Sequence, residues 1–301
     1  MSLTLIGGTG GLGFEIAKGL ASATGFTALR AVVRNRDAQK SKELEAMGWT
    51  IVVVTDFQNE IAVKEAFEGT KTVVSAFGGR DLVSLEMTAL RAAKHAGASL
   101  YVPSQFGVDH RRWGSSFPFL TGKKKILDTA KELDMPTLSV FCGYFSDWIF
   151  DFLADPANAK GRLIGDGGTK ISFTRRSDIG YVLAKALVDP KLAKGGILSL
   201  QGDCKTWMEA IQMLEKIKGK RFELDFLDPQ EALKQEQDLL QKGMAGDVGA
   251  FYGAFGLHLL GEPARGNTGC DLRAEAKSYG VKLESLEETL SKVYAEAEGK
   301  F

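Results

Sequence analysis

Ile6-Gly7-Gly8-Thr9-Gly10-Gly11-Leu12-Gly13 stands near the start of the 301-residue chain, between an apolar run and a helix-like segment. Glycines at this spacing are typical of the first strand-to-helix turn of a dinucleotide-binding fold. One glycine permits the tight turn, Gly10 lets the backbone approach a pyrophosphate, and Gly13 lets the helix pack against the strand. The N–H groups of the helix terminus then face the phosphates. The stretch predicts a dinucleotide site, although an ordinary strand-turn-helix also fits a chain with 35 glycines.

The first half of the chain alternates apolar runs with amphipathic segments. The predicted strands are Leu3 to Ile6, Thr27 to Val33, Thr50 to Thr55, Thr72 to Ser75, Ser99 to Val102 and Thr137 to Phe141. The predicted helices are Leu12 to Ala23, Ala38 to Met47, Glu60 to Phe67, Leu82 to His95 and Lys123 to Leu133. Nearly all-apolar strands separated by helices indicate a parallel sheet covered on both faces. We therefore predict a Rossmann-type, doubly wound α/β fold with its ligand at the carboxyl ends of the strands.

The pattern becomes less regular after Phe141. We expect helices at Gly143 to Leu153, at Asp178 to Leu187 and over much of Lys205 to Leu260, with strand-like pieces in Lys160 to Arg176 and at Arg221 to Phe226. No Pro- or Ser-rich linker separates these parts. We therefore predict a nucleotide-binding domain at residues 1–150, onto which 177–200 pack back, and a smaller, interleaved substrate lobe formed mainly by 151–176 and 201–301.

The composition restricts the classes of partner. The 38 basic and 38 acidic residues cancel, so no general attraction to nucleic acid or to an anionic membrane is expected. No stretch of roughly 18 apolar residues is present to span a bilayer. The three cysteines are odd in number and widely spaced, which favours a reducing, cytoplasmic location and predicts no metal site. The oligomeric state is left open.

The end of the second strand predicts the type of dinucleotide. An NAD site has an acidic residue there, whereas a 2′-phosphate calls for an arginine. The chain has Val33-Arg34-Asn35-Arg36, and Lys40 follows in the next element. A guanidinium can bind the phosphate through charge-assisted hydrogen bonds, so we predict NADP(H). The alternative is a solvated basic edge in which these cations pair with Asp37 and Glu43.

Several longer stretches together resemble one family. They are GGTGGLG, VVRNRDAQKSKELEAMG, VVVTDF, YVPSQFGVD, SVFCGYFSDW, GDGGTKISFTRRSDIGYVLAKAL and YGVKLESLEETLSKVYAE. The combination is similar to the NmrA-like and isoflavone-reductase-like branch of the atypical short-chain dehydrogenases. The resemblance runs from residue 1 to about residue 296 and is weakest from Gly202 to Gly269, where we expect the substrate pocket to be shaped.

The resemblance implies a set of cofactor-binding positions. Those around the pyrophosphate are Gly7, Thr9, Gly10, Leu12 and Gly13, and those at the 2′-phosphate are Arg34 and Lys40. Those that border the adenosine and ribose are Ser75, Ala76 and Phe77, and those near the nicotinamide are Pro103, Ser104, Gln105 and Phe106. Many members have Glu at the position of Gln105 and Gln at that of Glu86, so neither residue supports a mechanism.

The resemblance also implies a catalytic lysine, which aligns with Lys123. Most short-chain dehydrogenases place a tyrosine four residues before such a lysine, on the same helix face. This chain has Phe119 there, as expected for the isoflavone-reductase-like pattern, in which the lysine works without a phenol. Lys123 then hydrogen-bonds the nicotinamide ribose and donates a proton. The alternative is an exposed lysine cluster, since Lys123 opens the run Lys123-Lys124-Lys125.

Other side chains have two interpretations each. Tyr144, Phe145, Trp148, Phe150 and Phe152 form either a flat aromatic pocket wall or ordinary core. As a pocket wall, Tyr144, Phe145 and Trp148 would contact the substrate together with Phe106. The run Asp109-His110-Arg111-Arg112 is either a second acid or an anion contact, or else an exposed loop, and we expect the exposed loop. Cys142 is expected to be an inert buried thiol.

Two functions follow from the sequence. The first is an NADPH-dependent oxidoreductase, isoflavone reductase-like, that reduces a small conjugated, aromatic or polyketide-like substrate with Lys123 as proton donor. The second is a non-catalytic NADP(H)-sensing regulator that binds a protein partner, as on the NmrA-like side of the family. Lys123 and the aromatic segment favour the enzyme.

Overall fold

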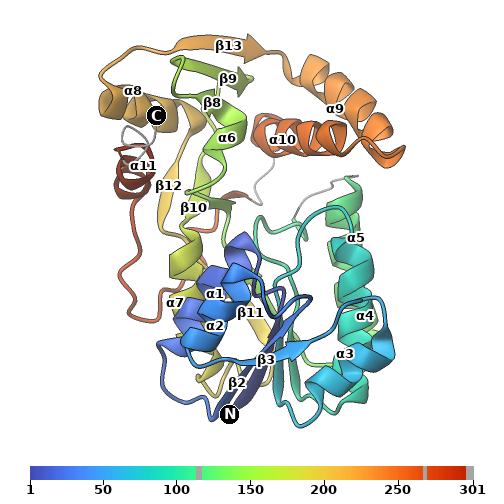
Figure 1. The fold of residues 1–301 in the computed structure, drawn as a ribbon. Helices are drawn as coiled ribbons and strands as arrows, with labels where there is room; N and C mark the ends of the chain where they lie inside the picture. The colour runs from blue at the N-terminus through green and yellow to red at the C-terminus, as the bar shows by residue number, and fades with distance from the viewer. Residues whose placement is uncertain (113–116, 267–269, 296–301) are drawn as a thin grey trace.

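The structure is a computed structural model that describes residues 1–112, 117–266 and 270–295. Its elements form a lower part built on a parallel sheet and an upper part of helices and short strands (Figure 1). Most of the lower part comes from β1 (Ser2–Ile6), α1 (Gly11–Ala21), β2 (Ala28–Val33), α2 (Gln39–Ala46), β3 (Thr50–Val53), α3 (Glu60–Phe67), β4 (Thr72–Ser75), α4 (Leu82–His95), β5 (Leu100–Val102), α5 (Pro118–Glu132) and β6 (Leu138–Phe141).

The remaining elements follow the sixth strand. They are β7 (Tyr144–Phe145), α6 (Phe150–Leu153), β8 (Ala154–Asp155), β9 (Lys160–Ile164), β10 (Ile171–Thr174), α7 (Arg176–Leu187), β11 (Gly196–Ser199), β12 (Asp203–Lys205), α8 (Trp207–Lys218), β13 (Glu223–Leu227), α9 (Pro229–Met244), α10 (Val248–Ala264) and α11 (Leu286–Ala295). Two of them return to the lower part: α7 packs against α1, and β11 pairs with β6. The predicted domain boundaries themselves stay a prediction.

The central sheet has five parallel strands in the order β3-β2-β1-β4-β5. A parallel bridge between Tyr101 and Thr137 continues it to β6, which pairs in parallel with β11. Because the chain first builds outward through β2 and β3 and then crosses to β4, the strand order reverses between β1 and β4. Ligands of such sheets bind at this reversal, outside the carboxyl ends of the strands. The predicted doubly wound parallel fold is confirmed.

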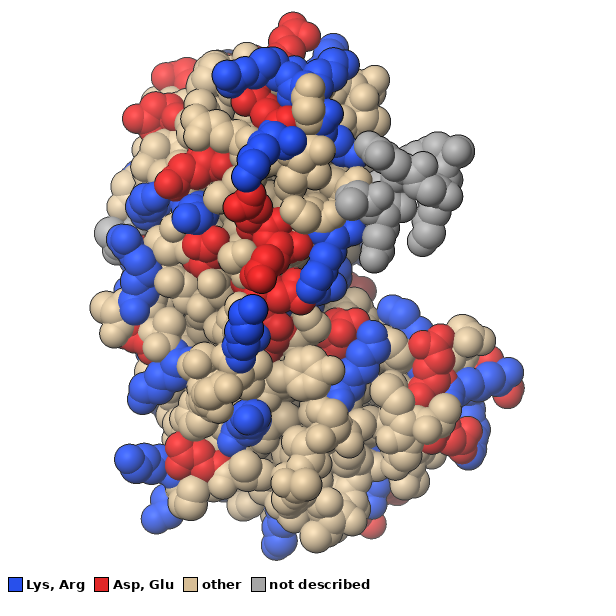
Figure 2. Space-filling view, turned by 90° about the vertical axis from the view of Figure 1, so that its left-hand side faces the viewer, with Lys and Arg blue, Asp and Glu red and all other residues tan. Residues whose placement is uncertain are grey.

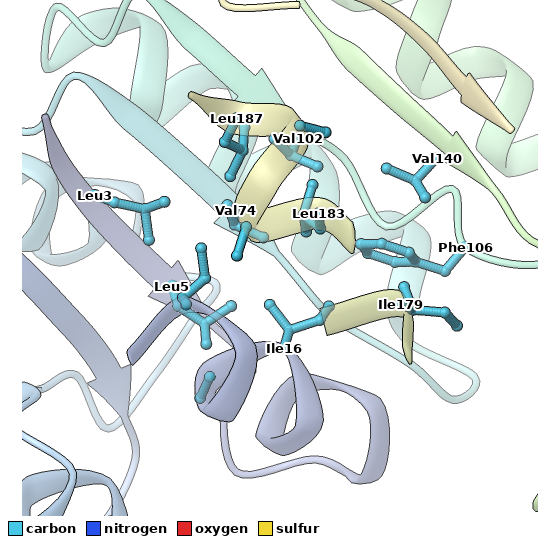
Figure 3. Close-up of a cluster of buried hydrophobic side chains, with 14 of the residues drawn as sticks. Leu3, Leu5, Ile16, Val74, Val102, Phe106, Val140, Ile179, Leu183 and Leu187 are labelled. Carbon is cyan, nitrogen blue, oxygen red and sulfur yellow. The ribbon is translucent and has the colours of Figure 1, made fainter. Parts of the chain in front are cut away.

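Apolar side chains cover both faces of the sheet. On one face, strand residues meet α1 and α7, as Figure 3 shows for Leu3, Leu5, Ile16, Val74, Val102, Val140, Ile179, Leu183 and Leu187. On the other face, a second cluster includes buried residues of α3, α4 and α5, among them Phe67, Leu90 and Ile126. Burial on both faces explains why the strands are almost continuously apolar in sequence.

The upper part has its own core, centred on Phe150, Phe173 and Trp207. Its two three-stranded sheets have the orders β12-β10-β7 and β13-β9-β8. Three of its helices begin at side-chain caps: Thr206 and Glu209 form a capping box at α8, and the Asp228 and Asp247 side chains accept N–H groups at α9 and α10. The strongly capped α9 and α10 lie side by side above the end of α5 (Figure 1).

Two predicted helices differ from the structure by more than two residues at one end. The helix expected over Gly143 to Leu153 is present only at Phe150–Leu153. Gly143 has a φ of 65° and packs against Ser172, and Tyr144 and Phe145 then pair in parallel with β10, so sheet pairing replaces the helix. The helix expected from Lys123 begins earlier, at Pro118, because proline is well suited to the first helical turn.

The surface carries both signs of charge. Figure 2 shows Lys and Arg interspersed with Asp and Glu on one face, and a concave outline between the upper and lower parts. None of the described helices combines the length and the apolar character needed to cross a bilayer. The three cysteines are free thiols, and Cys142 and Cys270 are buried. The predicted cytoplasmic location stays a prediction.

Candidate functional site

A pocket of about 460 Å³ lies where the carboxyl ends of the central strands meet the upper part. Its floor consists of residues from the loops after β1, β4 and β5, and its walls come from α5, the segment after β6, and α10. Ten of the predicted site residues line it, namely Gly10, Leu12, Ala76, Phe77, Ser104, Phe106, Lys123, Tyr144, Phe145 and Trp148. The sheet therefore brings the motif-derived residues and the aromatic segment to one place.

Two glycines of the turn between β1 and α1, Gly7 and Gly13, have no space for a side chain. Gly7 has a φ of 83°, and a Cβ on it would lie 2.8 Å from the Ala76 backbone. A Cβ on Gly13 would lie 2.1 Å from the Gly7 carbonyl oxygen. Gly10 is the N-cap of α1 and supplies no capping side chain, so the first N–H groups of this helix are available to a ligand. The turn, which includes Thr9, fits the diphosphate of a dinucleotide.

Two cations lie beside this turn. Arg34 directly follows β2, and its guanidinium lies 4.6 Å from the centre of the Phe57 ring. The Lys40 ammonium lies 5.4 Å from the centre of the Phe14 ring. Within residues 1–112, 117–266 and 270–295, neither cation forms an ion pair, whereas Arg36 pairs with Glu45. The alternative of pairing with Asp37 and Glu43 is therefore not what the structure shows for Arg34 and Lys40.

The loops after β4 and β5 are tied together beneath the pocket. The Ser104 hydroxyl donates a hydrogen bond of 2.7 Å to the Phe77 carbonyl oxygen, and both residues line the pocket. Ser75 is fully buried beside the Glu86 carboxyl and does not line the pocket. Pro103 is also buried, and its carbonyl oxygen accepts the Gln105 N–H. Ser75 and Pro103 are therefore part of the buried base of these loops and not of the pocket lining.

Lys123 is buried in the second turn of α5, with 4% of its surface exposed, unlike its exposed neighbours Lys124 and Lys125. Its ammonium donates a 3.0 Å hydrogen bond to the Phe106 carbonyl oxygen and lies 4.9 Å from the centre of the Phe119 ring. Burial lowers the pKa of Lys123 from its usual value to about 8. The lysine thus reaches the pocket as a cation that can release its proton near neutral pH.

A second hydrogen bond links the backbone of Lys123 to the loop after β5. The Gln105 side chain donates to the Lys123 carbonyl oxygen at 3.0 Å, so the loop after β5 and the helix α5 are linked in both directions. The Gln105 amide oxygen accepts a 2.5 Å hydrogen bond from His110 Nε2. Gln105 therefore orients the lysine-bearing helix and does not line the pocket.

The expectation of an exposed loop at His110 is wrong. His110 is 5% exposed, and burial lowers its pKa to about 4, so the ring is neutral at pH 7. Asp109 is fully buried and pairs with Arg111 and Arg112. The sequence shows polar residues in a loop but cannot show that the fold covers them. His110 supports Gln105 and has no contact with the pocket.

Glu86 lies behind the loop after β5. It is fully buried, accepts hydrogen bonds from the Tyr101 hydroxyl and the Ser104 N–H, and has its pKa raised to about 7 by burial. Attraction to Lys123 opposes part of this rise in pKa. Glu86 does not line the pocket, so it acts on the site only through Ser104 and through its charge.

The aromatic segment is divided between the pocket wall and the core, and its contact with a substrate stays a prediction. Phe145 and Trp148 line the pocket, and so does Tyr144, whose hydroxyl donates to the Leu259 carbonyl oxygen at 2.6 Å. Phe150 belongs instead to the core, and Phe152 packs edge-on against Trp148. The expectation for Cys142 agrees with a thiol that is fully buried and whose pKa is raised to about 12.

The sequence reasoning missed part of the pocket wall. The α10 residues Phe251, Tyr252 and Phe255 line the pocket, as does Arg176 at the start of α7. Phe255 packs against Phe119, another lining residue, with ring centres 5.5 Å apart. The spacing of the α10 aromatics indicates a helix face, but no local pattern says what that face covers.

The fold and the pocket define a class: a doubly wound α/β protein with a glycine turn that fits a dinucleotide and a mostly apolar pocket that contains a buried lysine. A model described as the NmrA-like family matches residues 1–294, and the chain belongs to this family. The family resemblance predicted from the motifs is thereby confirmed.

Individual relatives share the fold and a limited identity. An isoflavone reductase homolog from Zea mays is 27% identical over 253 residues, which cover 78% of this chain and 80% of the relative. A solved structure of AtPrR2 with NADP⁺ and (+)-pinoresinol has a TM-score of 0.79 at 20% identity, covering 97% of this chain and 98% of that one. The leucoanthocyanidin reductase–NADPH complex from Vitis vinifera has a TM-score of 0.79 at 18% identity, with the same coverage. The prediction of an NADP(H)-dependent oxidoreductase agrees with the names and bound cofactors of these relatives.

Proposed function

We propose that this protein is an NADPH-dependent reductase of a small conjugated, aromatic or polyketide-like molecule, with Lys123 as the proton donor. The observation that carries the proposal is the buried Lys123 ammonium in the wall of an otherwise mostly apolar pocket at the dinucleotide turn. Burying a cation costs free energy, so an ammonium in such a place is typical of a functional group.

The residues of the turn fit the cofactor. The uncapped start of α1 suits the diphosphate, and Arg34 with Lys40 suits a 2′-phosphate. When bound, NADPH supplies the hydride. Ala76, Phe77 and Ser104 line the pocket floor and would hold the nicotinamide half of the cofactor there.

Lys123 then handles the proton. Its pKa of about 8 keeps the ammonium protonated at pH 7 while leaving the proton easy to release. The ammonium donates to the substrate atom that becomes negative as the hydride arrives, directly or through a water. Gln105 and the Phe106 carbonyl oxygen keep the side chain and its helix in this position.

The pocket walls favour a flat, apolar substrate. Phe106, Phe119, Phe145, Trp148 and Phe255 line them, and the described lining residues include no carboxylate. Aromatic walls bind planar ring systems through stacking and edge contacts. The structure of AtPrR2 contains (+)-pinoresinol, an aromatic small molecule, which supports the same class of ligand here.

The test is turnover with 4-deuterated NADPH and a panel of conjugated aromatic and quinone-like acceptors. We expect NADPH oxidation with one acceptor class and, where the acceptor is reduced at carbon, deuterium on that carbon of the product. If no acceptor is reduced while NADP(H) promotes binding of a protein partner, the protein is a regulator and the proposal is wrong.

A further inference from the structure

Two cationic side chains line the described part of the pocket, Lys123 and Arg176. Lys123 is deep in the pocket, on α5, and the proposed chemistry uses it. Arg176 is the first residue of α7 and lies by the glycine turn at the other end of the pocket. No function has yet been given to this second cation.

The packing of two helices sets the position of Arg176. A Cβ on Gly19 of α1 would lie 2.2 Å from the Gly180 carbonyl carbon, and a Cβ on Gly180 of α7 would lie 2.3 Å from the Glu15 carbonyl oxygen. The backbones of α1 and α7 are therefore in direct contact. Arg176 is one turn before Gly180, so the contact brings it to the start of α1. A Cβ on Gly11, the first residue of α1, would lie 2.7 Å from Arg176 Nη1.

Asp147 orients the guanidinium. Arg176 Nε donates to Asp147 Oδ2 at 3.0 Å, and Nη2 donates to the Asp147 carbonyl oxygen at 3.4 Å. Across residues 1–112, 117–266 and 270–295, Nη1 makes no hydrogen bond, and it is the nitrogen nearest to the turn. The Arg176 side chain is 25% exposed, so solvent or a ligand can reach it.

The N-termini of α7 and α1 differ in whether a side chain accepts their free N–H groups. At α7, the Arg176 N–H donates to Asp147 Oδ1 at 3.4 Å. At α1, no side chain caps the first N–H groups. A helix terminus carries only about half a positive charge, less than the charge on a diphosphate. A guanidinium beside the uncapped terminus supplies the missing charge through short, charge-assisted hydrogen bonds.

We propose that Arg176 binds the diphosphate of the dinucleotide, with Nη1 donating across the start of α1. This inference rests on the dinucleotide site and not on the role of Lys123 as proton donor. Arg34 and Arg176 then divide the recognition of the ligand: Arg34 binds the 2′-phosphate, and Arg176 binds the bridging phosphates.

The test compares two ligands that lack the nicotinamide. 2′-Phosphoadenosine 5′-diphosphoribose contains both phosphate groups, whereas 2′-AMP has no diphosphate. For Arg176→Met, calorimetry should give about 10- to 100-fold weaker binding of the diphosphoribose, the usual effect of losing one hydrogen bond to a charged group. Binding of 2′-AMP should change by less than about twofold. Arg34→Ala should instead weaken the binding of both ligands.

Two further variants distinguish the loss of the Arg176 charge from a general disturbance of the fold. Arg176→Gln removes the charge but can still donate to Asp147, and it should show the same selective loss. Arg175→Met is the matched control, because the neighbouring guanidinium pairs with Glu284 and does not line the pocket. The proposal is wrong if Arg176→Gln binds the diphosphoribose normally, or if Arg176→Met weakens both ligands equally. Because no turnover is measured, failure of the reductase proposal leaves this result interpretable.

Discussion

The turn between β1 and α1 and the pocket above it are built in opposite ways. The turn is formed by the backbone of consecutive residues. Gly7 and Gly13 are required in it because a Cβ at either position would collide with neighbouring backbone atoms. The pocket uses side chains from distant elements, from Phe106 after β5 to Phe255 in α10. A site of the first kind is visible as a sequence motif. A site of the second kind is fixed only when the chain has folded.

The largest expected effect comes from a side chain in the turn. Gly10→Val should abolish dinucleotide binding, because Gly10 lines the pocket at the cap of α1, where the diphosphate would lie. The cost in stability should be modest, since a Cβ there meets only the Gly7 carbonyl oxygen, at 3.2 Å. Calorimetric titration with NADPH and thermal unfolding measure the two quantities. A folded variant with normal affinity would mean that the run is only a turn.

The next effect concerns the type of dinucleotide. Arg34→Ala should remove most of a preference for NADP(H) over NAD(H), because one charge-assisted contact contributes about 1.5 to 3 kcal/mol, or one to two decades in affinity. Calorimetry with both cofactors measures the preference. Arg36→Ala is the control, because Arg36 pairs with Glu45, and it should leave the preference unchanged. Equal affinity of the unmodified protein for both cofactors contradicts the assignment.

The smallest of these effects belongs to the pocket wall. Phe255→Ala should raise the KM for substrate roughly tenfold, from the loss of about 1.4 kcal/mol of apolar contact, and should leave NADPH affinity unchanged. Phe226→Ala is the control, since Phe226 is 55% exposed on β13 and remote from the pocket lining. Steady-state kinetics at saturating NADPH provides the measurement. An unchanged KM would remove α10 from the substrate site.

The sequence predicts the regular half of the molecule well for a physical reason. In β4, α3 and α4 the observed bounds equal the predicted ones. The reason is that the spacing of apolar residues within a buried parallel strand or an amphipathic helix directly reflects which positions are buried. Lys123 is predicted as a site residue through its alignment with a family pattern, and the structure places it in the pocket lining, while its catalytic role stays a prediction. Its burial was not predictable from the lysine run alone.

The remaining site residues depend on contacts between distant segments. His110 looks like an exposed loop residue until Gln105 and the segments around it cover the ring. In the sequence, Arg175 and Arg176 are two equivalent arginines at the start of a helix. The contact of α7 with α1 places Arg176 beside Gly11, whereas Arg175 pairs with Glu284. No local pattern encodes either placement.

The most direct test of the central claim is the pH dependence of kcat for the unmodified protein and for Lys123→Met. An ammonium with a pKa of about 8 is protonated at pH 7 and loses its proton as the pH rises through 8. If it is the acid, kcat of the unmodified protein should be level near pH 7 and fall about tenfold per pH unit well above 8. Lys123→Met should lower kcat at pH 7 by roughly two decades and lose this dependence, while NADPH affinity changes little. A variant that keeps the turnover and the pH profile of the unmodified protein would contradict the account.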